Sequence, residues 1–365
     1  MANKAYKFRI YPNAGQKILF ARTFGCVRFI YNKMLSDKIK YYEETKQKLN
    51  NTPAQYKAEF GWLKEVDSLA LANAQMNLQK AYNNFFKSPK AGFPKFKSKH
   101  KNRNSYTTNN QKGSVSIENG CIKLPKIGFV KLKQHRQIPS GYKLKSVTIS
   151  QNPSGKYYAS ILFEYENQVQ EQDLHNFLGL DFSMHELYKD SNGNEPAYPG
   201  YYRNAEKKLK REQRKLSLMQ KGSKNRNKQR IRVAKMHEKA ANQRKNFLHK
   251  QSRQIANAFD CVCIENLDMK AMAQCLNFGK SVADNGWGTF VTFLQYKLEE
   301  SGKKLVKVDK FFASSQTCSV CGYKNTATKN FSIRAWDCPK CGTHHDRDIN
   351  AAINIKNEGM RIVNV

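Results

Sequence analysis

Apolar and basic side chains alternate from Tyr6 to Tyr11, and the alternation stops at Pro12. A repeat of two positions predicts a β-strand with one buried face and one cationic, solvated face. Apolar residues then recur at helical spacing over Ile18 to Tyr42, and again over Ser68 to Phe86, where Ser68 is the expected N-cap. The chain is therefore expected to begin with a strand that is followed by two helices.

Short alternating segments return after about residue 105, and they include a predicted hairpin whose turn spans Asn152 to Gly155. A short polar linker follows them. Residues 1–172 therefore predict a β-rich, barrel-like N-terminal module that carries a helical insertion at about residues 15–105.

A different pattern begins at Phe177, where an apolar run to Leu180 predicts a buried strand that reverses into a second strand. Residues 201–250 have mostly helical spacing, and the polar stretch from Lys221 to Arg230 is expected to break them into two helical arms. Another apolar run predicts a buried strand that ends near Glu265.

An amphipathic helix that is expected to end at Gly302, a further strand, and a final helix from about Asp348 complete the pattern. Strands that alternate with helices indicate an α/β fold. We expect a second domain over residues 173–365, with a basic helical insertion at about residues 201–256.

The 365 residues carry 64 Lys and Arg against 29 Asp and Glu, which gives a formal net charge of +35. Such an excess is unusual for a metabolic enzyme and attracts polyanions, because neutralised phosphates release counterions. Nucleic acid is the expected partner, and a ribosome-like or membrane-surface basic protein is the alternative. The sequence has no apolar run of about 18 residues and no N-terminal signal peptide. We therefore expect a cytoplasmic location and no membrane partner.

The positive charge is densest over residues 201–250, which hold 18 Lys and Arg and three Glu. A solvated helical face is the simpler interpretation of such a run, but its like charges would repel one another without a polyanion. We expect nucleic acid to contact the following cations of this segment: Lys207, Lys208, Lys210, Arg211, Arg214, Lys215, Arg226 and Arg230.

A second basic stretch, Phe93 to Tyr106, alternates aromatic residues with Lys and Arg. Phe93, Phe96 and Tyr106 could stack on bases or ribose, or could equally belong to the core. Lys95 and Lys97 of the same stretch are candidate contacts to nucleic acid.

Four of the nine cysteines have the spacing CxxC-x16-CxxC, namely Cys318, Cys321, Cys338 and Cys341. This spacing is typical of a zinc ribbon, in which four thiolates fill a tetrahedral shell and the Zn²⁺ is structural. Chance spacing and a redox CxxC pair are the alternatives. We expect the ribbon at about residues 314–344, and we expect His344 and His345 to ligate nothing because four sulfurs suffice.

Asp181 and Glu265 each follow an apolar run and should project from the end of a buried strand, whereas Asp346 and Asp348 flank the start of the last helix. Buried carboxylates are costly without a partner, and Mg²⁺ prefers hard oxygen ligands, so a divalent metal site is one interpretation. Surface turns and helix caps are the other, and Asp348 in particular could cap the last helix.

Three motifs of the second domain are GLDFS (Gly179 to Ser183), IENL (Ile264 to Leu267), and the cysteine pattern that continues into GTHHDRDINAAINI. They resemble the three RuvC motifs and the zinc finger of the transposon-encoded TnpB (OrfB) proteins, relatives of the compact type V CRISPR effector nucleases. The N-terminal stretch KFRIYPNAGQKILFARTFGCVRFIYN and the segment GFPKFKSK also resemble that family. The resemblance spans nearly the whole chain and implies an RNase H-like (RuvC) nuclease core with an inserted zinc ribbon.

This resemblance implies an RNA-guided DNA endonuclease. A guide RNA derived from the transposon end would pair with one strand of double-stranded DNA beside a short flanking motif, and one two-metal RuvC site would cut both strands. Asp181, Glu265 and Asp348 would be the catalytic ligands of Mg²⁺, and Asp346 competes for the third position. The protein would act as a monomer within a ribonucleoprotein in the prokaryotic cytoplasm, associated with the nucleoid.

The reader of the flanking motif is expected in the N-terminal module. Asn73, Gln75, Asn77 and Gln79 of its second helix are candidates, because side-chain amides can read the edge of adenine. Three other functions stay open at this point: a nuclease-inactive, RNA-guided DNA-binding regulator, a non-catalytic zinc-ribbon RNA-binding protein, and a transposase.

Overall fold

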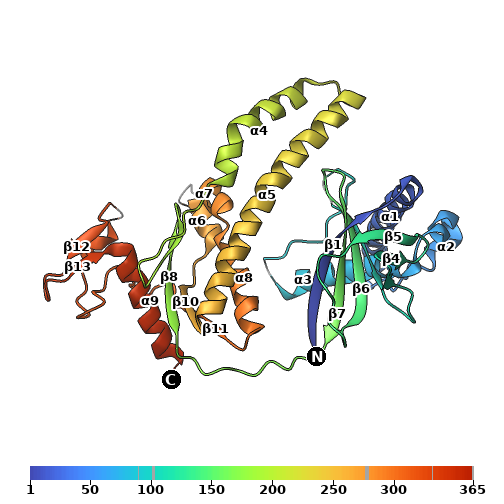
Figure 1. Cartoon of the computed structure of the whole chain (residues 1–365). Coiled ribbons are helices and arrows are strands. Elements are labelled where there is room, and N and C mark those ends of the chain that lie inside the picture. Colours follow the sequence, from blue (N-terminus) through green and yellow to red (C-terminus); the bar gives the residue numbers. More distant parts are fainter. Residues whose placement is uncertain (89, 101–102, 276–278, 331, 364–365) are drawn as a thin grey trace. The chain divides into compact units, whose positions relative to one another are not determined.

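In the computed structural model, the chain is divided into two compact units, Met1–Asn167 and Gln168–Val365 (Figure 1). The boundary lies after Asn167 rather than after residue 172, because the linker belongs to the second unit, where Gln172 N donates to Gly302 O at 3.0 Å. The structure describes residues 1–365 except 89, 101–102, 276–278, 331 and 364–365. Within these residues, no helix combines the length and the apolarity that crossing a membrane requires.

Seven antiparallel strands form one sheet in the first unit, in the order β2-β6-β7-β1-β5-β4-β3. The strands are β1 (Ala2–Tyr11), β2 (Asn104–Asn109), β3 (Ser116–Glu118), β4 (Cys121–Leu124), β5 (Gly128–Lys133), β6 (Lys143–Gln151) and β7 (Tyr157–Tyr165). Tyr6, Phe8 and Ile10 of β1 are buried and the residues between them are not, which confirms the predicted strand. No pair joins β2 to β3 in the described residues, so the strand pairing does not bear out closure into a barrel.

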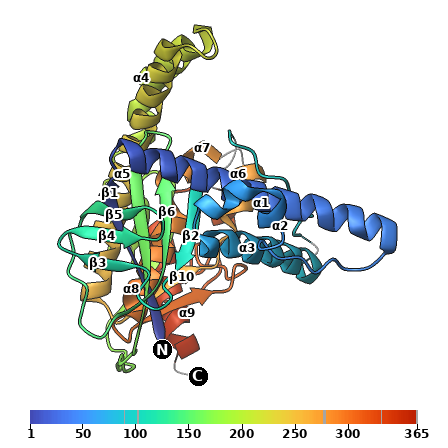
Figure 2. The same ribbon diagram turned by 90° about the vertical axis from the view of Figure 1, so that its right-hand side faces the viewer.

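Helices are inserted between β1 and β2, as expected, and α1 and α3 lie against the sheet (Figure 2). They are α1 (Ala14–Thr45), α2 (Tyr56–Glu59), a 3-10 helix (Gly61–Glu65) and α3 (Ser68–Lys87). The N-cap of α3 is Asp67 and not the predicted Ser68. The Asp67 carboxylate accepts hydrogen bonds from Leu69 N at 3.0 Å and from the hydroxyl of Thr108 in β2.

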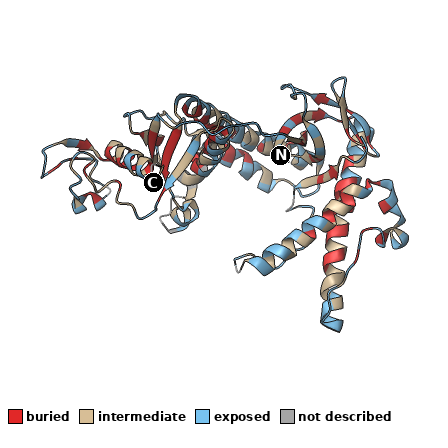
Figure 3. Cartoon of the chain, turned by 90° about the horizontal axis from the view of Figure 1, so that it is seen from below, coloured by how far each residue is buried: buried red, intermediate tan, exposed pale blue. Residues whose placement is uncertain are grey.

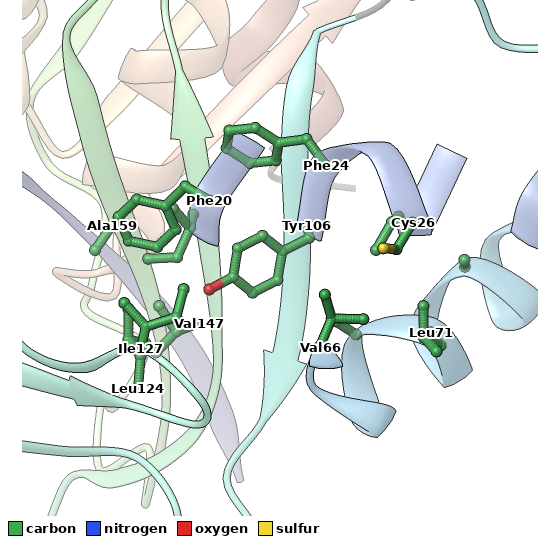
Figure 4. Close-up of a cluster of buried hydrophobic side chains, with 14 of the residues drawn as sticks. Phe20, Phe24, Cys26, Val66, Leu71, Tyr106, Leu124, Ile127, Val147 and Ala159 are labelled. Atoms are coloured by element: carbon green, nitrogen blue, oxygen red, sulfur yellow. The ribbon is translucent and has the colours of Figure 1, made fainter. Parts of the chain in front are cut away.

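Aromatic side chains join α1 to the sheet in the core of the first unit (Figure 4). The rings of Phe20 and Phe24 lie 6.3 and 5.9 Å from the ring of Tyr106 in β2, centroid to centroid. Tyr106 is 4% exposed, so the core interpretation is correct for this residue. Phe93 and Phe96 are exposed instead, and they remain candidates for contact with a partner. In Figure 3 each described residue is coloured by how far it is buried.

A four-stranded sheet in the order β11-β10-β8-β9 forms the centre of the second unit. Its strands are β8 (Phe177–Ser183), β9 (Leu187–Asp190), β10 (Cys261–Glu265) and β11 (Lys304–Val308). β10 runs parallel to β8 and to β11, whereas β9 is antiparallel to β8. The predicted α/β pattern is confirmed, because helices form the crossovers that parallel strands require.

The helices of the second unit are α4 (Tyr201–Leu218), α5 (Lys224–Ala258), α6 (Met269–Cys275), α7 (Gly279–Asn285), α8 (Trp287–Glu299) and α9 (Arg347–Val363). α4 and α5 run side by side and form a helical hairpin (Figure 1). The break between them is shorter than predicted, because Ser223 caps α5 by accepting a hydrogen bond from Arg226 N at 3.1 Å. α8 ends at Glu299, and Gly302, the expected end, lies in the turn after it.

α9 approaches one face of the sheet closely at two glycines. A Cβ atom on Gly179 of β8 would lie 2.0 Å from Ala352 O, and a Cβ on Gly359 of α9 would lie 2.1 Å from Cys263 Sγ. Cys263 pairs with Gly179 in the register of β10 and β8, so both contacts occur on the same face. The two glycines therefore determine how closely α9 packs on the sheet.

We expect Gly179→Ala to destabilise the second unit, because the added methyl group would overlap the backbone of α9. Overpacking typically costs about 1–3 kcal/mol, and a collision with backbone should fall at the upper end and lower Tm by roughly 2–4 °C for each kcal/mol. Thermal unfolding measures the effect. The matched control is Gly288→Ala in α8, where nothing lies within 4 Å of the new Cβ. Equal Tm values for Gly179→Ala and wild type would contradict the close approach.

Candidate active site and zinc ribbon

The ends of two parallel strands bring Asp181 and Glu265 to one edge of the sheet. Ile264 of β10 pairs with Leu180 of β8, so Glu265 and Asp181 occupy the next positions on neighbouring strands. Successive side chains of a strand point to opposite faces, which places both carboxylates on the face that carries Gly179. This is the face that α9 covers.

Asp348 reaches the same place from α9. It lies in the first turn of that helix, one turn before Ala352, whose carbonyl lies against Gly179. Burial raises the pKa of Asp181 well above its usual range, and the negative charges of Glu265 and Asp348 raise it further. Because charge effects weaken with distance, Glu265 and Asp348 both lie near the Asp181 carboxylate.

Arg347 and Ser314 act on two of these carboxylates. The positive charge of Arg347 lowers the pKa of Asp181 and so opposes part of the increase. Burial raises the pKa of Glu265, and a hydrogen bond from the Ser314 hydroxyl opposes that change. Ser314 therefore holds the Glu265 carboxylate in one orientation.

Asp346 is occupied as a helix cap. Its Oδ1 accepts hydrogen bonds from the backbone N of Asp348 at 2.9 Å and of Ile349 at 3.0 Å, and its Oδ2 lies 3.2 Å from Lys189 Nζ. Burial opposes ionisation, but these donors hold the pKa of Asp346 below its ordinary value. Asp348 makes a longer contact, 3.4 Å, with Arg334. The geometry thus favours Asp348 over Asp346 as a metal ligand.

The three carboxylates suit divalent cations. A bound cation would relieve their mutual repulsion, and carboxylate oxygens are the ligands that Mg²⁺ prefers. Among the described residues, only the four cysteines of the ribbon gather tightly enough to surround a single ion. The wider spread of the carboxylates is compatible with ligands that share two ions about 4 Å apart.

The cysteine cluster has the dimensions of a zinc site. The four sulfurs lie within 4.8 Å of one another; Cys318 Sγ is 3.7 Å from Cys341 Sγ, and Cys321 Sγ is 3.5 Å from Cys338 Sγ. Four Zn–S bonds of about 2.3 Å in a tetrahedron place the sulfurs about 3.8 Å apart. The residues present therefore fit Zn²⁺ without an open position.

Two similar turns hold the sulfurs in place. Gly322 N donates to Cys318 O at 3.0 Å, and Gly342 N donates to Cys338 O at 2.8 Å. Both glycines have positive φ angles, 73° and 72°, which side chains with a Cβ rarely adopt. The glycine after each CxxC pair is thus explained by the turn that it closes.

The two histidines after the second pair have different surroundings. His345 is buried, and its Nε2 lies 3.1 Å from Cys318 Sγ. His344 is exposed, and its Nδ1 lies 2.7 Å from Asp337 Oδ1. His345 can therefore hydrogen bond to a sulfur of the cluster without belonging to it. It stays a prediction that neither histidine ligates Zn²⁺.

Two buried asparagines of α9 join the zinc ribbon to the carboxylates, and sequence reasoning missed them. Asn350 accepts from Ser319 N at 2.9 Å and donates to Thr317 O at 2.7 Å, and Asn354 donates to Ser314 O at 2.8 Å. Since the Ser314 hydroxyl donates to Glu265, one network connects the first cysteine turn, α9 and Glu265. We call these contacts the amide network. Its signal in the sequence is a pair of amides four positions apart on an apolar helix face.

The eight cations of residues 201–250 that were predicted to contact nucleic acid lie on the hairpin of α4 and α5, and all eight are exposed except the half-buried Arg226. Glu212 is buried between the arms, with carboxylate oxygens 3.7, 3.9 and 3.4 Å from Arg211, Lys215 and Arg232. Gln229 of α5 donates to the Glu212 carboxylate at 2.8 Å. Glu212 therefore offsets part of the repulsion between the arms, and the outer cations remain exposed.

The candidate readers on α3 are partly engaged within the first unit. Asn73, Gln75 and Gln79 each donate a side-chain hydrogen bond to a neighbouring residue. Asn77 and Lys95 are exposed. Their contacts with nucleic acid stay predictions.

Three protein-family descriptions match the chain. They are "Helix-turn-helix domain" over residues 1–47, "Probable transposase" over residues 160–276 and "Cas12f1-like, TNB domain" over residues 287–355. The last of these ranges contains the zinc ribbon and the start of α9. Residues 1–47 form a strand and one long helix in this structure rather than two helices joined by a turn.

Known proteins match the chain over nearly its whole length. A "Putative RNA-guided DNA endonuclease" of Streptomyces pristinaespiralis is 31% identical over 98% of this chain and 89% of its own length. A "Putative RNA-guided DNA endonuclease InsQ" of Escherichia coli K12 is 29% identical over 99% and 93%. A solved structure, "Cryo-EM structure of the Cas12f1-sgRNA-target DNA complex", shares the fold with a TM-score of 0.62 at 15% identity, over 98% of this chain and 99% of that one. The chain therefore belongs to the TnpB (OrfB) family, which is related to the compact type V CRISPR effectors.

Proposed function

We propose that this protein is an RNA-guided DNA endonuclease that cuts double-stranded DNA at one RuvC-type site. The observation that carries the proposal is the meeting of three carboxylates, in which Glu265 and Asp348 raise the pKa of Asp181. Carboxylates that repel one another at the ends of buried strands are typical of a functional site rather than of a structural ion pair. The names of the two relatives support an RNA guide and a DNA target.

Asp181, Glu265 and Asp348 would hold two Mg²⁺ ions. When bound, Mg²⁺ supplies activation of a water molecule and stabilisation of the leaving oxygen of a phosphodiester. The chain itself positions these three carboxylates. The parallel strands fix Asp181 beside Glu265, the Ser314 hydroxyl orients Glu265, and the cap made by Asp346 sets the start of the helix that carries Asp348.

The remaining parts of the chain suit the binding of nucleic acid. A guide RNA from the transposon end would pair with the target strand, and such a heteroduplex is held through its phosphates rather than its bases. The exposed cations of the α4 and α5 hairpin fit this role. The first unit would read the flanking DNA motif, structural Zn²⁺ would stabilise the ribbon, and the complex would contain one copy of the protein.

Cleavage of a plasmid library tests the proposal. The protein would be purified with RNA from its own locus and given Mg²⁺ and a guide-matched target flanked by randomised bases, with Asp181→Ala beside it. Cutting by wild type alone, next to one short motif, supports the proposal and identifies the motif. Guided binding of matched DNA without cutting by either protein would instead indicate a nuclease-inactive regulator. Binding of RNA without recognition of matched DNA would indicate a non-catalytic RNA-binding protein.

A further inference from the structure

A small cavity in the first unit has three cations among its lining residues. It has a volume of about 210 Å³, and its lining residues are Phe24, Val27, Arg28, Lys97, Arg103 and Ser105. Half of these residues are Lys or Arg, one is a hydroxyl donor, and none is acidic. Arg28 belongs to α1, whereas Lys97 and Arg103 belong to the stretch before β2, so the fold brings together charges from two parts of the chain that are distant in the sequence.

Lys97 is held at this cavity by its backbone and by its side chain. Lys97 N donates to Asn32 Oδ1, and Asn32 Nδ2 donates to Lys97 O, both at 2.8 Å. The Lys97 ammonium lies 3.9 Å from the centre of the Tyr31 ring. Tyr31 and Asn32 lie on the same side of α1 as Val27 and Arg28, one turn later. The position of the ammonium is thus prepared before any ligand arrives.

Among the described residues, the cations at the cavity have no acidic partner. Elsewhere in the first unit, cations of α1 do have acidic partners: Arg22 lies 3.0 Å from Glu65, and Lys33 lies 3.0 Å from Asp37. In the described part of the chain, no carboxylate forms an ion pair with Arg28, Lys97 or Arg103. Burial also lowers the pKa of Lys97, which an approaching anion would reverse.

We propose that this cavity binds one backbone phosphate of the nucleic acid that the protein carries. The inference rests on the proposed function only in that nucleic acid is the partner. Two guanidinium groups and an ammonium suit an oxyanion, and arginine matches phosphate geometry with paired donors. The buried side chains of Phe24 and Val27 form an apolar floor, and the lower local dielectric strengthens each contact. The distributed cations of α4 and α5 would bind many phosphates weakly, whereas this cavity would fix one.

The phosphate could belong to RNA or to DNA, and ethylation interference distinguishes the two. Ethylation neutralises single phosphates at random, and molecules that still bind are separated from those that do not. One experiment uses ethylated RNA from the protein's own locus, and the other uses ethylated guide-matched DNA with the complete ribonucleoprotein. We expect one phosphate, in one of the two nucleic acids, whose ethylation weakens binding by about tenfold, the scale of a charge-assisted contact.

Variants show whether the cavity is responsible. In Arg103→Ala, ethylation at that phosphate should no longer weaken binding, because the contact is already lost. The affinity should fall by about tenfold. The slope of log affinity against log salt concentration should become shallower by about one, which corresponds to the loss of one phosphate contact. Arg28→Ala should behave in the same way. Arg136→Ala, an exposed residue outside the cavity, removes the same charge and should leave the interference pattern unchanged.

Two results would overturn the inference: no phosphate stands out with the wild-type protein, or the same phosphate still stands out in both cavity variants. Its failure can be told apart from a failure of the proposed function. Guided cutting without a sensitive phosphate rejects the cavity alone, and a sensitive phosphate without cutting rejects the nuclease alone. A wild-type protein that binds neither nucleic acid rejects both.

Discussion

Asp181→Asn should severely impair DNA cutting and at the same time stabilise the metal-free protein. Burial and the charges of Glu265 and Asp348 raise the pKa of Asp181 in the folded state, so the folded chain holds this proton more strongly than the unfolded chain does. The stability that the group contributes is complete below its unfolded pKa of about 3.9, and it is lost as pH rises through the raised pKa. An asparagine side chain has the shape of aspartate but no charge, so the variant does not lose this stability as pH rises.

Thermal unfolding without Mg²⁺, between about pH 4 and pH 8, measures the effect on stability. With rising pH, wild type should lose stability relative to the variant, and by neutral pH the variant should be more stable by about 0.5–2 kcal/mol. Added Mg²⁺ should raise Tm for wild type but not for Asp181→Asn, because only the wild-type site binds it fully. Cutting of matched plasmid should fall about a thousandfold or more, as when a group that stabilises transition-state charge is lost.

Asp346→Asn is the matched control. The pKa of Asp346 is lowered in the folded state despite burial, so this group contributes stability above its unfolded pKa, and that stability is lost as pH falls. The substitution should therefore slightly lower stability at neutral pH and leave cutting nearly intact, whereas Asp348→Asn should lose cutting. Lost cutting in Asp346→Asn together with normal cutting in Asp348→Asn would reverse the assignment of the third acid. Normal cutting by Asp181→Asn would reject the site itself.

The parts of the candidate site that could be predicted are those with a local signal. An apolar run that ends in one acid indicates a buried strand with a carboxylate at its end, which identified Asp181 and Glu265 as candidates. The cysteine spacing predicted a ribbon because a tetrahedral metal constrains that spacing directly. Both patterns reflect forces that act over a few residues.

The features that could not be predicted depend on partners distant in the sequence. Asp67 rather than Ser68 caps α3 because Thr108, a strand residue, donates to its carboxylate. The amide network uses backbone groups more than 30 positions away from Asn350, and two asparagines alone do not reveal them. The cavity of the first unit joins Arg28 of α1 to Lys97 and Arg103 of the stretch before β2; the sequence marked Lys97 as a candidate contact but did not pair it with Arg28. Tertiary contacts decide all three cases.

Cys338→Ser should lose bound Zn²⁺ and with it the folded ribbon. Cys338 is 2% exposed and lies 3.5 Å from Cys321 Sγ, so its loss opens a shell that four thiolates would close. Structural Zn²⁺ contributes about 10–16 kcal/mol of apparent binding free energy in small zinc domains. The loss of one thiolate should therefore unfold the ribbon, although the apolar contacts of α9 with the sheet should persist. Zinc content by elemental analysis and limited proteolysis of residues 314–346 measure the two effects.

The consequences should extend beyond the ribbon because of the amide network. When the first cysteine turn loosens, Ser319 and Thr317 no longer hold Asn350, and the start of α9 with Asp348 loses an anchor. We therefore expect Cys338→Ser to bind less Mg²⁺ and to cut poorly even where the second unit stays folded. Cys121→Ser, which changes a half-buried thiol in the sheet of the first unit, is the control and should leave zinc content and cutting unchanged. A Cys338→Ser protein with full zinc content, a protease-resistant ribbon and normal cutting would show that the four thiolates do not form the structural site. Loss of Zn²⁺ with unchanged cutting would show instead that the ribbon and Asp348 are independent of each other.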